Sequence, residues 1–210
     1  MMYAFVGSGG KTTLLKQTAE TFRKEGKTVL VTPSTHMFIE PDSLLTDDAD
    51  TIIRKLQDTG YVMAGIPDGI KLSPLSKQTF DAVCPYADVV LVEADGSRML
   101  PLKFPNITEP VIPEATDVIY VVCGLNAIGQ KAVDVCHRLE LVKECLGIED
   151  DTIITPDHVW TLVKEGYLRP LREKYPDKQI ILSPRDNGSA EQIAIGEMLK
   201  AKANAYMKEY

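Results

Sequence analysis

Short apolar runs alternate along this chain with longer segments in which apolar residues recur at helical spacing. Turn or helix signals flank each run, which is typical of buried strands. The pattern predicts five strands, at about residues 3–6, 28–32, 89–92, 118–122 and 179–182. Strands that alternate with helices indicate an α/β fold, in which helices cover both faces of a mainly parallel five-stranded sheet.

The intervening segments predict helices with one apolar face and recognisable ends. They cover about residues 11–24 and 48–57, a segment that begins near Pro74, a segment from Pro156 behind the cap Thr155, and a final one behind the capping pair Ser189 and Gln192. Residues 61–65 and 70–72 flank a Pro-Asp-Gly turn, which predicts a small hairpin. We therefore expect one domain over residues 1–210, in which residues 61–72 are a candidate insertion.

The composition narrows the function classes. The formal net charge is -7 and no dense Lys or Arg block is present, so neither nucleic acid nor an anionic membrane is an expected partner. The chain lacks a signal-peptide pattern and any apolar run long enough to span a bilayer, so we expect a cytoplasmic protein. Its four cysteines show no C-x-x-C spacing, which favours reduced core thiols over a zinc site.

The first predicted strand leads into the segment GSGGKTT and then into a helix. Glycines let the backbone turn tightly and bring its N–H groups close to phosphate oxygens, and a helix N-terminus favours an anion. In this arrangement Lys11 reaches the outer phosphates and the Thr12 hydroxyl ligates Mg²⁺. We expect Lys11 to be an exposed loop residue. The candidate nucleotide-binding residues of this phosphate loop are Gly7, Ser8, Gly9, Gly10, Lys11, Thr12 and Thr13.

The phosphate loop departs from the full Walker A pattern, because Phe5 stands where that pattern has its first glycine. Gly7 lies only three residues before Gly10, which gives the shortened form G-x-x-G-K-T-T. This form resembles the loop of Mur ligases and folylpolyglutamate synthases. A strand, three glycines, Lys-Thr-Thr and a helix in this order favour a phosphate site over a glycine turn with a chance Lys-Thr pair.

An acidic segment follows the apolar run at residues 89–92. In a sheet of this kind, a carboxylate at the C-terminal end of a strand beside the phosphate loop can ligate Mg²⁺ directly or through water. Glu93 directly follows the run and is the preferred metal ligand, together with Thr12. Asp95 is the alternative ligand, or the group that orients an attacking water. Lys11 and Asp95 are therefore the candidate catalytic residues.

Hydroxyl and imidazole groups follow the second predicted strand and are expected at the same edge of the sheet. Thr35 and His36 are candidates for contacts with phosphate or substrate, although a lone histidine more often forms a structural hydrogen bond. Four basic residues are further candidates for neutralising phosphate charge, with a solvated surface position as the simpler interpretation of each. They are Arg98, Lys103, Arg138 and Arg185.

Several of these segments together resemble the YqeC-type family, whose members are regarded as accessory proteins of selenium-dependent molybdenum hydroxylases. The resemblance is carried by GSGGKTT, by residues 32–37, by Glu-Ala-Asp-Gly-Ser at 93–97 and by Glu-Pro-Val-Ile-Pro at 109–113. It continues to Ile-Thr-Pro at 154–156 and so covers nearly the whole chain. It implies a P-loop NTPase fold and a role in making or inserting a labile selenium cofactor, with a molybdenum hydroxylase or a cofactor-maturation protein as partner.

This family often has an Asn-x-x-Asp element after the fifth strand, similar to the base-reading motif of GTPases. Here the corresponding residues are Ser183, Pro184, Arg185 and Asp186. Asp186 can still accept hydrogen bonds from a guanine edge, but Ser183 replaces the asparagine and Pro184 has no backbone donor. The sequence therefore leaves ATP and GTP open as nucleotides, and we expect weak discrimination between them.

These features predict a protein that binds Mg²⁺ with ATP or GTP and hydrolyses the triphosphate slowly. Two alternatives stay open. The first is a small-molecule kinase or ligase, although 210 residues leave little room for the substrate domains of a full Mur-type ligase. The second is a nucleotide-dependent switch or chaperone without significant turnover.

Overall fold

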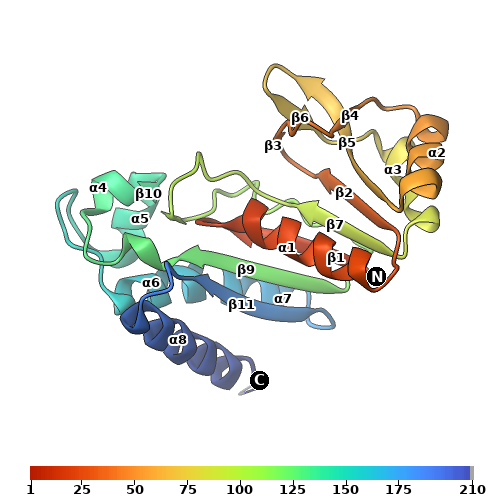
Figure 1. Cartoon of the computed structure of the whole chain (residues 1–210). Helices are drawn as coiled ribbons and strands as arrows, with labels where there is room; N and C mark the ends of the chain where they lie inside the picture. The colour runs from red at the N-terminus through yellow and green to blue at the C-terminus, as the bar shows by residue number, and fades with distance from the viewer. Residues whose placement is uncertain (209–210) are drawn as a thin grey trace. The chain divides into compact units, whose positions relative to one another are not determined.

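The computed structural model describes residues 1–208. It confirms the α/β class, because the strands pair mainly in parallel and helices pack against them (Figure 1). The backbone divides into two compact units. The first unit holds residues 1–5, 12–96 and 111–117, and the second holds residues 6–11, 97–110 and those from 118 onward. The expectation of one domain over the whole chain stays a prediction.

The first unit is a sheet whose strands are joined by helices. Its elements are β1 (Met2–Gly7, of which residues 2–5 belong here), α1 (Lys11–Lys24, from residue 12), β2 (Val29–Pro33), β3 (Met37–Phe38), β4 (Leu44–Leu45), α2 (Ala49–Thr59), β5 (Tyr61–Asp68), β6 (Lys71–Ser73), α3 (Lys77–Val83), a 3-10 turn (Cys84–Tyr86) and β7 (Val89–Glu93). The strand order is β1-β7-β2-β5-β6-β3, and β4 pairs with β5. The strands β1, β7, β2 and β5 are parallel, whereas β6 runs antiparallel to β5 and β3.

The second unit contains two parallel strand pairs and most of the remaining helices. Its elements are β8 (Leu102–Lys103), β9 (Val118–Gly124), a 3-10 turn (Leu125–Ala127), α4 (Ala132–Val135), β10 (Cys136–His137), α5 (Leu139–Leu146), α6 (Pro156–Val163), a π-helical turn (Lys164–Leu168), α7 (Arg169–Lys174), β11 (Gln179–Arg185) and α8 (Ala190–Lys208). β9 pairs with β11 along its whole length, and β8 pairs with β10. Helix α8 packs against β11, and α6 contacts β9.

All five predicted strands and the predicted helices are present. The helix expected near Pro74 begins at Lys77, because the Ser76 hydroxyl accepts a hydrogen bond from the Thr79 N–H and caps it. The hairpin is also present, as the antiparallel pair of β5 and β6. Its turn lies at Gly69, whose positive φ of 58° suits a glycine.

Strand β5 belongs both to the hairpin and to the parallel part of the sheet. Its first residues pair in parallel with β2, from Tyr61 opposite Val29 to Met63 opposite Val31. Val62, Met63 and Ala64 are all buried, as the strand of a covered parallel sheet requires. On the same side, Ile52 and Leu56 of helix α2 pack into a core cluster with Leu30 and Val90. The sheet of this unit therefore includes β5 in addition to the predicted strands β1, β7 and β2.

The register of the first unit brings three strand ends to one edge. Phe5 of β1 and Pro33 of β2 both lie opposite Glu93, the last residue of β7. Parallel strands in register deliver the loops that follow them to the same side of a sheet. The segments after β2 and β7 are therefore presented together, beside the point at which β1 leaves this unit.

Candidate functional site

The phosphate loop begins in the second unit, at the end of β1. Its backbone lies against β9: the Ser8 N–H donates a hydrogen bond of 2.9 Å to the Val122 carbonyl. Gly7 has a positive φ of 93°, and a Cβ at this position would lie 2.0 Å from the Val122 oxygen. Only glycine fits such an approach, which accounts for the first glycine of the shortened loop.

The segment of residues 97–110 lies against the phosphate loop within this unit. The Ser8 hydroxyl donates to the Pro101 carbonyl at 3.0 Å, and that carbonyl also accepts from the Gly124 N–H at 3.0 Å. Gly9 has a positive φ of 73°, and a Cβ there would lie 2.6 Å from the same Pro101 oxygen. The Pro101 carbonyl therefore fixes the loop by its hydrogen bonds and by close packing.

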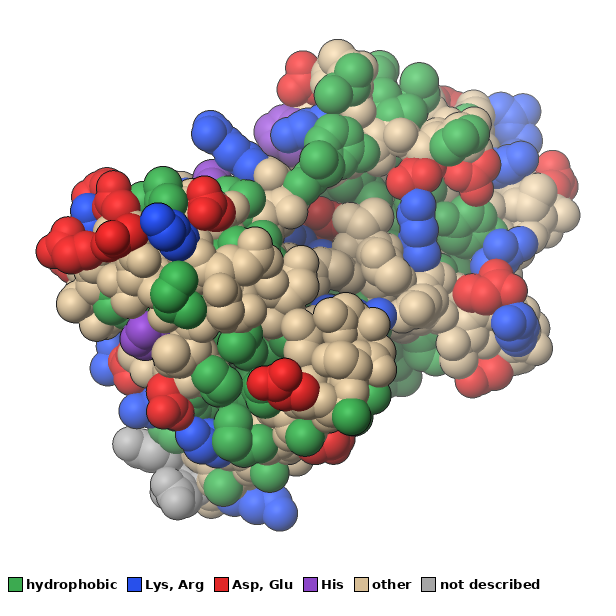
Figure 2. Space-filling model, turned by 60° about the vertical axis from the view of Figure 1, so that its left-hand side comes forward, with side chains coloured by type: hydrophobic (Ala, Val, Ile, Leu, Met, Phe, Trp, Pro, Cys, Tyr) green, Lys and Arg blue, Asp and Glu red, His purple; other side chains and the backbone are tan. Residues whose placement is uncertain are grey.

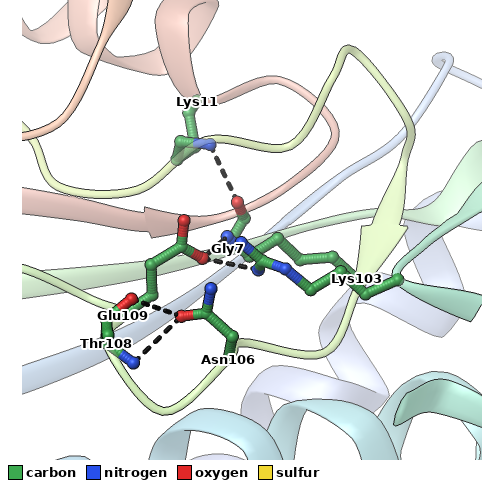
Figure 3. A network of polar contacts seen from close by, with 7 residues as sticks. Gly7, Lys11, Lys103, Asn106, Thr108 and Glu109 are labelled. Atoms are coloured by element: carbon green, nitrogen blue, oxygen red, sulfur yellow. Dashed lines mark hydrogen bonds and ion pairs between the residues drawn. The ribbon is translucent and has the colours of Figure 1, made fainter. Parts of the chain in front are cut away.

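Lys11 lies at the first position of α1 and turns its side chain back across the loop. Its Nζ donates a 2.8 Å hydrogen bond to the Gly7 carbonyl (Figure 3). Lys11 is only 4% exposed, so the expectation of an exposed lysine is wrong. Burial follows from the loop itself, because the side chain lies inside the turn that its own backbone makes. A charge held there adds to the partial positive charge of the helix N-terminus.

Thr12 and Glu93 meet in the first unit. The Thr12 hydroxyl donates to Glu93 Oε2 at 3.0 Å, and Glu93 is buried at 7% exposure. Magnesium binds oxygen ligands at 2.0–2.1 Å in an octahedron, so two neighbouring ligands lie about 3.0 Å apart. The two oxygens thus have the chemistry and the spacing of adjacent Mg²⁺ ligands. Thr13, the next residue of the motif, is exposed.

Asp95 and the segment after β2 also belong to the first unit. Asp95 is fully buried, and its neighbour Ala94 accepts a backbone hydrogen bond from Val111 at 2.9 Å. The Ser34 N–H donates to the Glu93 carbonyl at 3.0 Å, which brings the start of the predicted Thr35–His36 contact segment to the end of β7. The role of Asp95 in catalysis stays a prediction.

Thr35 and His36 differ in their surroundings. The Thr35 hydroxyl is buried and has no hydrogen-bond partner within residues 1–208. His36 is exposed, and its Nε2 lies 3.4 Å from Asp68 Oδ2 on the hairpin. The buried, unpaired hydroxyl of Thr35 suits a ligand contact better than the exposed His36 does, and both contacts stay predictions.

The predicted base-reading element lies in the second unit, at the end of β11. Asp186 is exposed and accepts a 2.9 Å hydrogen bond from the Gly188 N–H, so it stabilises the turn before α8. The contact of Asp186 with a nucleotide base stays a prediction. Arg185 approaches the phosphate loop, because a Cβ on Gly10 would lie 3.0 Å from the Arg185 Cγ. Sequence reasoning treated Arg185 only as a general candidate for phosphate neutralisation.

A second group of charged residues, for which the sequence favoured a solvated surface position, centres on the segment after Pro101. Lys103 has a fully buried side chain and pairs with Glu109 at 2.7 Å (Figure 3). Arg138 pairs with the same carboxylate at 2.6 Å. A solvated position, the simpler interpretation of Lys103, is therefore wrong. The sequence does contain one sign of this burial, because Lys103 is a single lysine in an apolar stretch. A charge in such a stretch is buried only if it has a partner.

A cavity of about 570 Å³ opens in the first unit near the ends of β2 and β7. Its walls are mostly apolar, and charged side chains stand among them. The lining includes Pro33, Ser34, Phe80, Val92, Val111 and the charged Lys77 and Asp81. Its volume is in the range of small-molecule pockets, and such pockets in α/β proteins lie at the C-terminal ends of strands.

Other possible sites receive less support from the described residues. Within residues 1–208, no three His, Cys, Asp or Glu side chains are grouped to hold a metal ion. Burial raises the pKa of Cys123 to about 12 and that of Cys136 to about 11, so these thiols stay protonated and unreactive. Over the same part of the chain, no helix combines the length and apolar character that crossing a membrane requires.

On the face shown in Figure 2, Lys and Arg side chains are interspersed with Asp and Glu side chains. A basic stripe of the kind that tracks a nucleic-acid backbone is not visible on that face, among the residues that the structure describes.

Comparisons with known proteins identify a matching protein family and a similar protein. The family model described as "YqeC protein" matches residues 3–140. The uncharacterized protein YqeC of Escherichia coli strain K12 is 31% identical over 178 residues, which cover 76% of this chain and 66% of that protein. The match thus spans just under two thirds of the relative's length.

A solved structure also matches the chain. It is the MinC:MinD cell division protein complex of Aquifex aeolicus, with 13% sequence identity and a TM-score of 0.38, over 100% of this chain and 96% of that chain.

The packing around Gly9 generates the first prediction. We expect Gly9→Ala to lower the free energy of unfolding more than Gly26→Ala does. Both glycines have a positive φ, of 73° and 76°, but only the Cβ at Gly9 would meet backbone atoms, the nearest at 2.5 Å. The strained backbone alone typically costs about 1–3 kcal/mol. Urea denaturation of the two variants measures the difference, and equal losses would show that the loop is not packed as described.

Proposed function

The chain belongs to the YqeC family, and we propose that it is a Mg²⁺-dependent nucleoside-triphosphate-binding protein that hydrolyses ATP or GTP slowly. The observation that supports this proposal most strongly is the hydrogen bond from Thr12, which directly follows Lys11 in the phosphate-loop motif, to the buried Glu93 carboxylate. A phosphate loop alone indicates an anion site. A loop followed at once by a threonine hydroxyl on a buried carboxylate indicates an anion that carries a metal ion.

The phosphates are bound by the backbone and by one lysine. Consecutive N–H groups from Gly9 and Gly10 lead into helix α1, and both the loop and the helix N-terminus favour a negatively charged group. Lys11 exchanges the Gly7 carbonyl, its 2.8 Å partner, for a phosphate oxygen. A charge-assisted contact of this kind is about twice as strong as a neutral hydrogen bond.

Thr12 and Glu93 would hold the metal ion. Their oxygens are hard ligands, the kind that Mg²⁺ prefers, and the ion would neutralise phosphate charge when bound. Glu93 is fixed in place by the pairing of β7 with both β1 and β2. In this account Asp95 orients a water molecule toward the terminal phosphate, so that catalysis consists of positioning and electrostatic stabilisation.

A second candidate function is phosphoryl transfer to a small acceptor, as in a kinase or ligase. The cavity of about 570 Å³ favours it, because Ser34 and Val92 in its wall are close in sequence to the Thr35 and Glu93 positions. Turnover that rises when a small acceptor is added supports this function. Turnover that stays negligible until a partner protein is added supports a nucleotide-dependent switch instead.

The family resemblance suggests where the protein acts. We propose that its client is a molybdenum hydroxylase, or a protein that matures the cofactor of such an enzyme, and that the nucleotide drives a step in making or inserting labile selenium. This part of the proposal rests on the resemblance of the motifs. The nucleotide site stands independently of it.

Lys11→Ala should remove most triphosphate affinity while leaving the fold intact. Lys11 is buried in the loop and its contact with phosphate is charge-assisted, which is typically worth about 1.5–3 kcal/mol. Calorimetry with ATP and with GTP measures the loss. Lys16→Ala is the matched control, because Lys16 lies on the same helix in a surface ion pair with Glu40. Unchanged binding of both nucleotides by Lys11→Ala would remove the phosphate site.

Glu93→Gln and Asp95→Asn should have different effects. The glutamine keeps the shape of Glu93 but removes a charged metal ligand, so Mg²⁺ should add much less to nucleotide affinity than it does in the wild type. Asp95→Asn should lower turnover with a smaller effect on the Mg²⁺ dependence. Nucleotide titrations at several Mg²⁺ concentrations, together with phosphate-release rates, compare the two variants. An exchange of these effects would reverse the assigned roles.

The selenium role has its own experiment. A cell that lacks this protein should still make selenocysteine-containing proteins, but it should lose the activity of molybdenum hydroxylases that carry labile selenium. The physical reason is that an accessory step acts on one client class after selenium has been activated. Hydroxylase activity and selenium incorporation are measured with and without the gene. Full hydroxylase activity in the deletion strain would reject the selenium role and leave the nucleotide site unaffected.

A further inference from the structure

The cavity of about 570 Å³ lies wholly within the first unit. Its lining comes from the ends of β2 and β7, from helix α3 with the residues just before it, and from the segment of residues 111–115. The volume is that of a small-molecule site, and the edge at which parallel strands end is where α/β proteins bind their ligands. The chemistry of the lining then indicates which class of molecule fits.

The segment of residues 111–115 is fixed to the ends of both strands through Val111. The Val111 N–H donates a hydrogen bond of 2.9 Å to the carbonyl of Ala94, which directly follows β7. The Val111 carbonyl accepts a hydrogen bond of 2.5 Å from the hydroxyl of Ser34, which directly follows β2. This wall of the cavity is therefore preformed, as the walls of ligand pockets usually are.

Apolar groups make up most of the lining. Phe80 is only partly buried, and Val111 is 45% exposed although it lies between two strand ends. Prolines at positions 33, 74 and 113 add further apolar surface. Covering such surface with an apolar molecule releases water and favours binding. The body of the ligand is therefore expected to be apolar.

The hydroxyl of Ser34 is a polar group within this lining. Its hydrogen is donated to the Val111 carbonyl, so its oxygen can still accept a hydrogen bond. A ligand hydroxyl can donate to that oxygen, whereas a carboxylate cannot. The Ser34 N–H also donates to the Glu93 carbonyl at 3.0 Å, so this polar group is bonded to the residue that is the proposed metal ligand.

The charged side chains of the lining interact with one another. Lys77 forms a hydrogen-bonded ion pair with Asp81, one turn further along α3. The hydrogen bond and the charge of Asp81 raise the pKa of Lys77, and the charge of Glu114 adds to this effect. An anionic ligand would have to compete with these carboxylates for Lys77, and a cationic ligand would have to compete with Lys77 for Asp81. The lining therefore favours a neutral ligand.

We propose that this cavity binds a small neutral alcohol, with its apolar body against Phe80 and Val111 and its hydroxyl donating to Ser34 Oγ. The inference deepens the second candidate function and rests on it for the fate of the ligand, which is the phosphoryl acceptor. In that function the alcohol oxygen bonds to the terminal phosphorus of the triphosphate while the bond from that phosphorus to its bridging oxygen breaks. The nucleoside diphosphate leaves, and the hydroxyl proton passes to water.

The experiment measures the binding of four probes to the full chain by NMR titration, without nucleotide. All four carry the same naphthyl body, and they differ in the group attached to it. They are naphthylmethanol, methylnaphthalene, naphthoate and naphthylmethylamine. We expect the alcohol to bind most tightly, because it alone combines an apolar body, a hydrogen-bond donor and no charge.

Ser34→Ala tests the hydrogen bond to the ligand. It should weaken the binding of naphthylmethanol by about threefold or more and leave that of methylnaphthalene within about twofold. Ser43→Ala is the matched control, because Ser43 is a serine of the same unit whose hydroxyl is hydrogen-bonded outside the cavity lining. If Ser34→Ala weakens both probes equally, the hydroxyl only supports the wall, and the assignment of an alcohol is overturned.

Val111→Trp tests the location of the site. The larger ring should fill the cavity and weaken naphthylmethanol by about tenfold or more. Because Val111 is 45% exposed, the exchange leaves the buried core in place. Ile70→Trp is the control, since Ile70 is a 73% exposed apolar residue of the same unit outside the lining. Binding of the alcohol that Val111→Trp leaves unchanged would overturn the proposal, as would tighter binding of naphthoate or naphthylmethylamine.

Failure of the nucleotide function has a different readout. In that case the wild-type chain binds neither ATP nor GTP, while naphthylmethanol still binds and still depends on Ser34 and Val111. If the nucleotides bind but naphthylmethanol does not, the phosphate site stands and the alcohol site is rejected.

Discussion

The close approach of the phosphate loop to β9 is the constraint from which the rest of the candidate site follows. A 2.9 Å hydrogen bond joins the Ser8 N–H to the Val122 carbonyl, and a Cβ at Gly7 would meet the same oxygen at 2.0 Å. A loop held this closely cannot move outward, so its remaining N–H groups and Lys11 are directed to one place. Preorganised donors cost little reorganisation when an anion binds, which is why such loops are effective phosphate sites.

The first unit contributes a second preorganised element. The pairing of β7 with both of its neighbours places Glu93 at the strand end, and Thr12 donates a hydrogen bond to it at 3.0 Å. Neither residue needs to move far to ligate a metal ion. Lys11, the proposed phosphate ligand, and Thr12, the proposed metal ligand, are adjacent residues at the start of helix α1, and Glu93 comes from the end of β7.

The sequence predicted the parts of this arrangement that depend on local pattern. The five strands, the phosphate loop and Glu93 follow from apolar runs and from the order of residues around them. The buried state of Lys103 did not follow, because its partner Glu109 lies after an irregular turn, and Arg138, which pairs with the same carboxylate, lies after the separate two-residue strand β10. Helix α5 was missed as well, since it begins behind Arg138 with a left-handed backbone and has no side-chain cap to mark it.

We have proposed that the phosphate loop and the Thr12–Glu93 pair bind one Mg²⁺-nucleoside triphosphate. The most direct measurement is a crystal structure of the protein soaked with Mg²⁺ and a non-hydrolysable triphosphate. We expect phosphate oxygens on the N–H groups of Gly9 and Gly10 and on Lys11, with Mg²⁺ bound by Thr12 and by Glu93 directly or through water. A nucleotide bound elsewhere, or a metal ion that contacts neither Thr12 nor Glu93, would contradict it.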